Sequence, residues 1–318
     1  MTLPKWCYAA ATAGVVLVIL ASPASAQKQW TPPHTIDGQP DLQGVWTNAT
    51  ITPFERPAQL AGKAYLTEQE AAELEKQSAK SKVDRPPSAG DVGNYNQVWF
   101  DSGTKVVGTR QTSLVMEPAN GLVPVKPAAE AKRDYDLAHI SDSYEHMSIW
   151  DRCITRGVPG RMFPAGYNNA YQIVQSAGNI VIMSEMIHDA RVIPLDGRAH
   201  APKEVRAWDG DSRGHWEGNT LVVVTKNLNG MTAAGGNGGG RTSDRITITE
   251  RFTMMDVNTL QYTATIDDPG TWTQPWTLTF PWKREPNYGM FEYACHEGNY
   301  AMRNILTISR AMDKASGK

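Results

Sequence analysis

The feature that most constrains the fold is a series of short segments in which every second residue is apolar. The series begins near residue 171, and turn residues such as Gly, Asn and Asp separate its members. Successive side chains of a β-strand point to opposite faces, so a period of two is typical of strands with one buried face. The segments are 171–175, 180–186, 190–195, 214–217, 220–226, 246–254, 260–266 and 276–282. Consecutive short strands joined by tight turns predict a mainly β protein, an antiparallel meander that forms a barrel or a sandwich.

Two segments ahead of this series favour helices at the periphery of the β domain. Residues 67–81 start with the capping-box pair Thr67 and Glu70 and are rich in Ala, Glu, Leu and Lys. Residues 127–138 start with a proline, which is tolerated at the first position of a helix. No part of the chain alternates helix and strand as a dinucleotide-binding fold does, and we expect no cofactor.

The first 26 residues predict an export signal. Lys5 precedes an apolar run over residues 9–20, and the small residues Ala-Ser-Ala at 24–26 fit a signal-peptidase site, with Gln27 as the first residue after cleavage. The apolar run is too short to serve as a stable membrane anchor. We therefore expect a periplasmic or secreted protein.

The rest of the chain is expected to form an arm and one domain. Residues 27–60 are rich in Pro, Gly and Thr and indicate an extended arm, within which Gly-Val-Trp at 44–46 could open a first strand. Residues 61–318 are expected to form a single β-rich domain. Residues 230–240 contain six glycines but lack the Lys-Ser/Thr ending of a phosphate loop. They are interpreted as a surface loop between strands, with a flexible lid as the alternative.

The net charge bears on the binding partners of the protein, and the cysteine content bears on its disulfides. The 31 basic and 33 acidic residues give a formal net charge of −2, so nothing favours nucleic acid as a partner. Cys153 and Cys295 remain after signal cleavage, and in an oxidising compartment they favour one disulfide. The alternative is a nucleophilic cysteine beside His296, and two distant cysteines do not make a metal site.

A carboxylate on an apolar strand face is the first candidate for chemistry. Glu250 shares a face of segment 246–254 with four apolar residues, and burying a charge there is costly unless it is paired. It is either part of a buried ion pair, for example with an arginine, or an acid or base that faces a cavity. The polar run with His188, Asp189 and Arg191 is the second candidate, and it fits either a proton-transfer site with an anion clamp or an ordinary turn.

Two more polar clusters follow along the chain. Cys295 is flanked by Tyr293, His296 and Glu297, and a disulfide at Cys295 would hold this segment rigidly. The three polar residues then either form a functional site or only surround the disulfide. Trp216 lies beside His215 in a segment that ends in a hairpin turn. No pair among the histidines has the spacing of a recognisable metal site, so we expect no metal.

Several of these stretches together resemble a broad family of secreted bacterial proteins of unknown function. They are GQPDLQGVW at 38–46, HDAR at 188–191, DGRAH at 196–200, GHWEGNTL at 214–221, ERF at 250–252 and CHEGN at 295–299. The resemblance implies export and a β-rich fold, and it carries no activity. The Gly-Val-Trp sequence at 44–46 is also similar to the Gly-x-Trp entry of lipocalin-type barrels, although a lipocalin is much shorter than this chain.

The function expected from these residues is acid–base catalysis, by hydrolysis or elimination, on a small organic or carbohydrate substrate. His188 is the expected general base, oriented by Asp189, and Glu250 or Glu297 is the expected acid. Arg191 is expected to hold a carboxylate or oxyanion of the substrate, and Trp216 and Tyr293 are expected to bind the substrate with it. His296 is a further expected catalytic residue. The alternatives are a lipocalin-like carrier of an apolar or aromatic compound and a structural surface protein without a ligand.

Overall fold

The computed structural model of the protein describes residues 30–84, 86, 97–232 and 241–317. The expected export signal and the glycine-rich residues 233–240 lie outside the described residues. The chain divides into two units after Thr31, and only Trp30 and Thr31 of the first unit are described. The second unit begins at Pro32 and holds the strands and helices.

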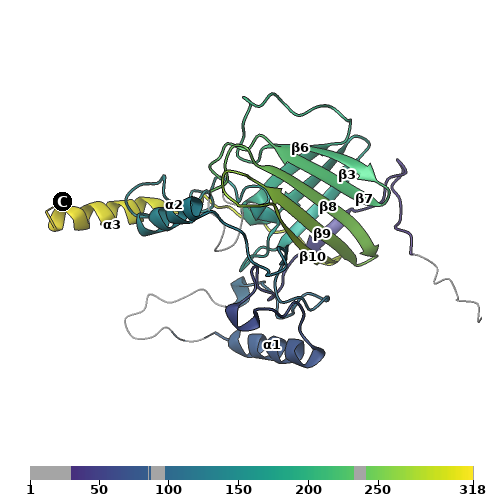
Figure 1. Ribbon diagram of the computed structural model, residues 1–318, viewed down its shortest axis with the longest axis horizontal. Coiled ribbons are helices and arrows are strands. Elements are labelled where there is room, and N and C mark those ends of the chain that lie inside the picture. The colour runs from purple at the N-terminus through teal and green to yellow at the C-terminus, as the bar shows by residue number, and fades with distance from the viewer. Residues whose placement is uncertain (1–29, 85, 87–96, 233–240, 318) are drawn as a thin grey trace, which may run out of the picture. The chain divides into compact units, whose positions relative to one another are not determined.

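Ten strands pair antiparallel in one sheet (Figure 1). The strand order is β5-β4-β3-β1-β10-β9-β8-β7-β6, and β2 pairs with β10 outside this path. The strands are β1 (Gly44–Thr47), β2 (Val115–Glu117), β3 (Ala170–Ser176), β4 (Asn179–Ser184), β5 (Asp189–Pro194), β6 (Asp211–Glu217), β7 (Thr220–Lys226), β8 (Thr247–Asp256), β9 (Thr259–Asp267) and β10 (Trp276–Arg284). The sheet curls into a nearly closed barrel, which confirms the mainly β class predicted from the period of two.

The strand β1 lies within the segment expected to be an extended arm. It pairs with β3 on one side and β10 on the other, so that Trp46 stands opposite both Tyr171 and Arg284. Trp46 is fully buried, and its indole nitrogen donates to the main-chain oxygen of Leu42 at 2.9 Å. The strand predicted to open at Gly-Val-Trp is therefore confirmed, and this part of the expected arm lies inside the sheet.

The barrel is incompletely closed between β5 and β6, the two ends of the strand order. A Cβ atom placed on Gly214 of β6 would lie 2.9 Å from Cγ2 of Ile193 in β5, so only glycine lets the two strands approach this closely. Arg191 of β5 also donates from Nε to Oγ of Ser212 in β6 at 2.9 Å. Side chains thus join the two strands across the seam.

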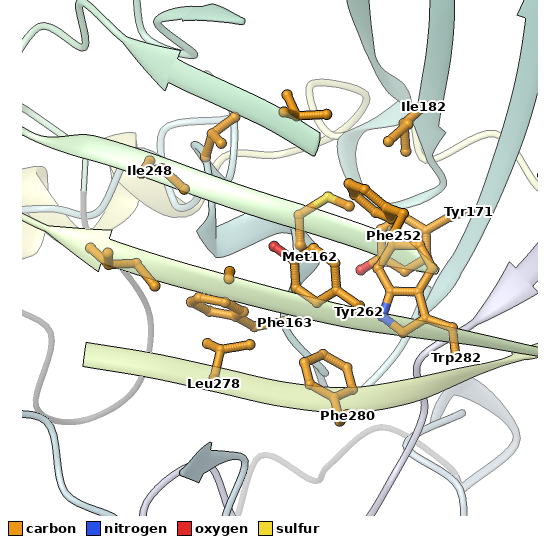
Figure 2. Packing of buried hydrophobic residues seen from close by; sticks show 14 of the residues in the cluster. Met162, Phe163, Tyr171, Ile182, Ile248, Phe252, Tyr262, Leu278, Phe280 and Trp282 are labelled. Atoms are coloured by element: carbon orange, nitrogen blue, oxygen red, sulfur yellow. The ribbon is translucent and has the colours of Figure 1, made fainter. Parts of the chain in front are cut away.

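Side chains fill the inside of the barrel (Figure 2). Phe252, Tyr262 and Trp282 come from three neighbouring strands, and the ring centres of Tyr262 and Trp282 are 5.3 Å apart. Met162 and Phe163 come from the end of the 3₁₀ turn η3 (Gly160–Met162) and lie among these strand residues. Because most of these side chains have no exposed surface, no water molecule fits beside them, and this part of the barrel is a packed core.

Three α-helices accompany the barrel in the described residues: α1 (Glu68–Ser81), α2 (Pro127–Ala138) and α3 (Ala301–Ala315). The remaining 3₁₀ turns are η1 (Ala58–Leu60), η2 (Gln97–Trp99) and η4 (Met186–His188). The first two α-helices lie where the sequence predicts them, and α1 has its capping box between Thr67 and Glu70. The helix α3 was not expected. None of the described helices is long and apolar enough to cross a membrane.

Candidate functional site

His188 lies at the turn between β4 and β5, in η4. Its ring is exposed, and Nδ1 is 2.7 Å from the main-chain oxygen of Tyr293. Since a carbonyl oxygen can only accept, Nδ1 carries the proton of the neutral ring and Nε2 keeps its lone pair. This contact holds the imidazole in the tautomer that a general base requires.

The backbone that presents His188 is strained. Ile187 has φ of 62° and His188 has φ of 40°, both in the left-handed region. A β-branched residue is rarely found there, and such a conformation costs about 1–3 kcal/mol. The buried side chain of Ile187 and the hydrogen bond from His188 N to Glu185 O, 3.0 Å long, hold the turn in place. Strain of this kind is concentrated at functional sites.

Asp189 does not orient His188 as expected. Its Oδ2 accepts from Oγ1 of Thr155 at 2.7 Å and from Nη2 of Arg161 at 2.6 Å. Arg161 is buried and also forms an ion pair with Asp209. Burial raises the pKa of Asp189, and the positive charge of Arg161 opposes that rise. The role assigned to Asp189 is therefore taken by the carbonyl of Tyr293.

Glu250 is locked in a buried ion pair with Arg191. Its two carboxylate oxygens accept from the guanidinium at 3.0 and 2.5 Å, and one of them also accepts from the hydroxyl of Tyr262 at 2.9 Å. The remaining donors of Arg191 reach Ser212 and Thr225. The expectations of a catalytic acid at Glu250 and of an anion clamp at Arg191 are wrong, because each charge is already satisfied by the other.

The predicted disulfide between Cys153 and Cys295 is present, with Cα atoms 5.6 Å apart. It excludes the alternative of a nucleophilic cysteine. The bond holds the segment of Tyr293 beside the barrel end, where the Tyr293 ring stacks on that of Tyr167 with centres 6.1 Å apart. His296 and Glu297 lie on the same segment and are exposed.

Trp216 does not belong to this site. It lies near the far end of β6, next to the turn to β7, whereas His188 lies where β5 begins. Its side chain packs against the core, which corrects the expected role in substrate binding. His215 beside it contacts Glu217 at 3.2 Å. Within the described ranges, no three His, Cys, Asp or Glu side chains are grouped so that they could hold a metal ion.

Glu185 is a site residue that the sequence reasoning did not select. Its side chain is 1% exposed and is held by Asn168, by the hydroxyl of Tyr288 at 3.1 Å and by the main-chain N of Phe291 at 3.3 Å. Burial and the negative charge of Glu185 raise the pKa of Tyr288. These bonds attach the segment after β10 to η4, and this attachment brings Tyr293 to His188.

Arg156 is the second missed residue. It follows the disulfide cysteine Cys153, and its guanidinium carbon lies 5.1 Å from the centre of the Trp150 ring. The sequence did contain a signal for it, since Arg152, Arg156 and Arg161 lie close to Cys153, which was expected to form a disulfide.

Neither the protein-family models nor the curated proteins provide a match to the chain.

Proposed function

We propose that this protein is an exported enzyme that uses Nε2 of His188 as a general base, in hydrolysis or elimination on a small organic molecule. The observation that carries this proposal is the 2.7 Å contact between Nδ1 of His188 and the Tyr293 carbonyl, on an exposed ring. The strained turn that presents the ring supports it. The disulfide supports export, because disulfides persist in oxidising compartments.

The proton taken by Nε2 would come from a water molecule or from a carbon next to an electron-withdrawing group of the substrate. The ring then becomes positively charged, and the negative charge of Asp189, its neighbour in the chain, acts on it favourably. His296 and Glu297 are the remaining candidates for the acid, since both are exposed on the segment that the disulfide holds.

The test is the variant His188→Gln, assayed with the wild type against a panel of esters, lactones and β-substituted carboxylic acids. A substrate that the wild type converts should be converted about 10²–10⁴ times more slowly by the variant, the usual effect of removing a positioned base. His215→Gln is the matched control, because His215 is also exposed but contacts only Glu217 in the described residues. Equal turnover by His188→Gln and wild type on every converted substrate contradicts the proposal.

A second candidate function, binding of an apolar small molecule, is favoured by a groove outside the barrel. The groove has a volume of about 420 Å³ and lies between α1 and the loops before and after it, with Leu60, Leu66, Leu74 and Val106 in its wall. The described core residues of the barrel are tightly packed, so this groove, and not the barrel interior, is the site proposed for such a ligand. An apolar fluorescent probe should bind the wild type, and Leu74→Glu should abolish this binding. Leu137→Glu, the matched substitution on α2, should leave the binding of the probe unchanged.

A further inference from the structure

Arg156 is a positive charge without a partner at the candidate site. Its side chain is partly buried, and within the described part of the chain its guanidinium lies against the face of Trp150 and takes part in no ion pair. No carboxylate lies within ion-pair distance of it, and no oxygen accepts a hydrogen bond from it there. A guanidinium has five donors and loses hydration when it is covered, so leaving it unpaired is costly.

The surroundings of Arg156 are suited to an anion. The hydroxyls of Tyr167, Tyr171 and Tyr293 lie within electrostatic range of its guanidinium, and burial lowers the pKa of Arg156. Tyr171 donates its hydroxyl to the main-chain oxygen of Arg161 at 2.6 Å, so its orientation is set. An incoming anion would restore the stabilisation that burial has removed from the guanidinium.

Four of the carboxylates at this end of the barrel are engaged elsewhere, and the exposed Glu297 forms no ion pair with Arg156 in the described residues. Asp189 and Asp209 both pair with Arg161. Glu185 is held by Asn168 and Tyr288, and Asp101 accepts from the backbone and side-chain nitrogens of Asn169 at 2.9 and 2.8 Å. Among the described residues no carboxylate pairs with Arg156, so its guanidinium is available to an anion from solution.

Tyr293 connects Arg156 with His188. Its main-chain oxygen receives the hydrogen bond from His188, and its ring lies parallel to Tyr167, with an angle of 10° between the planes. Trp150 and Tyr167 are also in contact, with ring centres 6.1 Å apart. Flat aromatic surfaces therefore lie beside an unpaired guanidinium and next to the residue that positions the proposed base.

We propose that Arg156 binds the carboxylate of a planar aromatic acid, whose ring packs on Trp150 and the tyrosines and whose remaining part faces His188. This proposal rests on the function proposed for His188, to which it adds a substrate class. A guanidinium matches the two oxygens of a carboxylate with two parallel hydrogen bonds, and it stacks on an aromatic face at the same time.

The test is isothermal titration calorimetry with benzoate, and with benzamide as the uncharged analogue of the same shape. Benzoate should bind the wild type with a dissociation constant of about 1 mM or lower, and benzamide should bind at least about tenfold more weakly, because it cannot form the charged pair. Arg156→Gln should weaken benzoate binding by at least about tenfold. Arg152→Gln is the matched control, since Arg152 is in the same segment and stacks on Tyr144 and Trp208 instead.

A second measurement covers the case in which Arg156→Gln does not fold. Phenylglyoxal modifies accessible arginines, and mass spectrometry of the wild type should show that benzoate protects Arg156 but not Arg152. The proposal is overturned if benzoate does not bind, if Arg156→Gln binds it as tightly as the wild type, if Arg152→Gln loses as much affinity, or if Arg156 is modified equally with and without benzoate.

The two proposals fail separately. Benzoate binding requires no proton transfer, so His188→Gln should still bind benzoate about as tightly as the wild type. Loss of benzoate binding in Arg156→Gln together with unchanged turnover in His188→Gln would refute the proposed function and keep the anion site. The reverse pattern would refute the anion site and keep the function.

Discussion

At the scale of single residues, Glu250 shows how one side chain fits two opposite interpretations. Its position on an apolar strand face indicates that the charge must be paired or functional, and the alternation of the strand shows only that it points inward. Arg191 comes from β5, at the other side of the seam, and no spacing in the sequence relates the two residues. The ion pair is a consequence of barrel closure.

The pair predicts a large effect on stability. Glu250→Gln leaves the charge of Arg191 buried without its counter-ion, so the free energy of unfolding should fall by about 3–5 kcal/mol. Urea denaturation of the wild type and the variant measures this loss. Glu217→Gln is the control, because the pair of Glu217 with Arg251 is exposed and should contribute little. An unfolding free energy of Glu250→Gln within error of the wild type would show that the pair does not stabilise the barrel.

At the scale of elements, α1 is the helix whose start is best determined locally. The hydroxyl of Thr67 accepts from Glu70 N at 3.2 Å, and the Glu70 carboxylate accepts from Thr67 N at 2.8 Å and pairs with Lys63. Each of these partners is within seven residues of Glu70 in the sequence. This is the reason that the sequence predicts this helix start correctly.

The same contacts predict how the stability of α1 depends on pH. Lys63, followed by Thr67, lowers the pKa of Glu70 from 4.5 to about 2. A carboxyl whose pKa is lower in the folded state stabilises that state above its unfolded pKa, and this contribution is lost as the pH falls through the folded pKa. Glu70→Gln should therefore melt below the wild type at neutral pH, and the difference should shrink between pH 4.5 and about 2.

Thermal unfolding followed by circular dichroism at a series of pH values measures this difference. Glu73→Gln on the same helix is the control, because Glu73 lies outside the capping box and contacts only Gln77 in the described residues. A gap between Glu70→Gln and the wild type that stays constant down to pH 2 would mean that the charge of Glu70 does not stabilise the helix start.

At the scale of the whole molecule, long-range connections build the candidate site. The disulfide joins residues 142 positions apart, and Tyr293 reaches His188 across 105 positions. Glu185 holds the same segment through Tyr288 and Phe291. We call residues 285–300, between β10 and α3, the strap. Contacts with Glu185 and His188 at the barrel end and the disulfide together hold the strap in position.

Removing the disulfide should affect both stability and the site. The double variant Cys153→Ser and Cys295→Ser opens a loop of 142 residues, which predicts a loss of roughly 3–5 kcal/mol in the chain-entropy description. Calorimetric unfolding of this variant and of the wild type measures the loss. Benzoate affinity should fall as well, since Tyr293 is then held by fewer bonds. Unchanged stability would contradict the structural role of the bond.

Features that depend on neighbouring residues in the chain are predictable from the sequence of this protein. The period of two identifies the strands β3 to β10 but not the short β2. The Thr67–Glu70 spacing identifies the start of α1, and two cysteines in an expected oxidising compartment identify the disulfide. The sequence analysis did not predict α3, although Met302, Ile305, Ile308 and Met312 recur there at the three- to four-residue spacing of a helix.

Only the tertiary structure decided which polar side chains meet. Barrel closure brings Arg191 to Glu250 and so removes two expected site residues, while the strap brings the carbonyl of Tyr293, and not Asp189, to His188. Arg156 is left without an ion pair in the described residues for the same reason, since Asp189, Asp209 and Glu185 are held by other partners. Contacts between charges depend on distance in space. A single sequence does not contain the distance between Arg191 and Glu250, 59 positions apart, or between His188 and Tyr293, 105 positions apart.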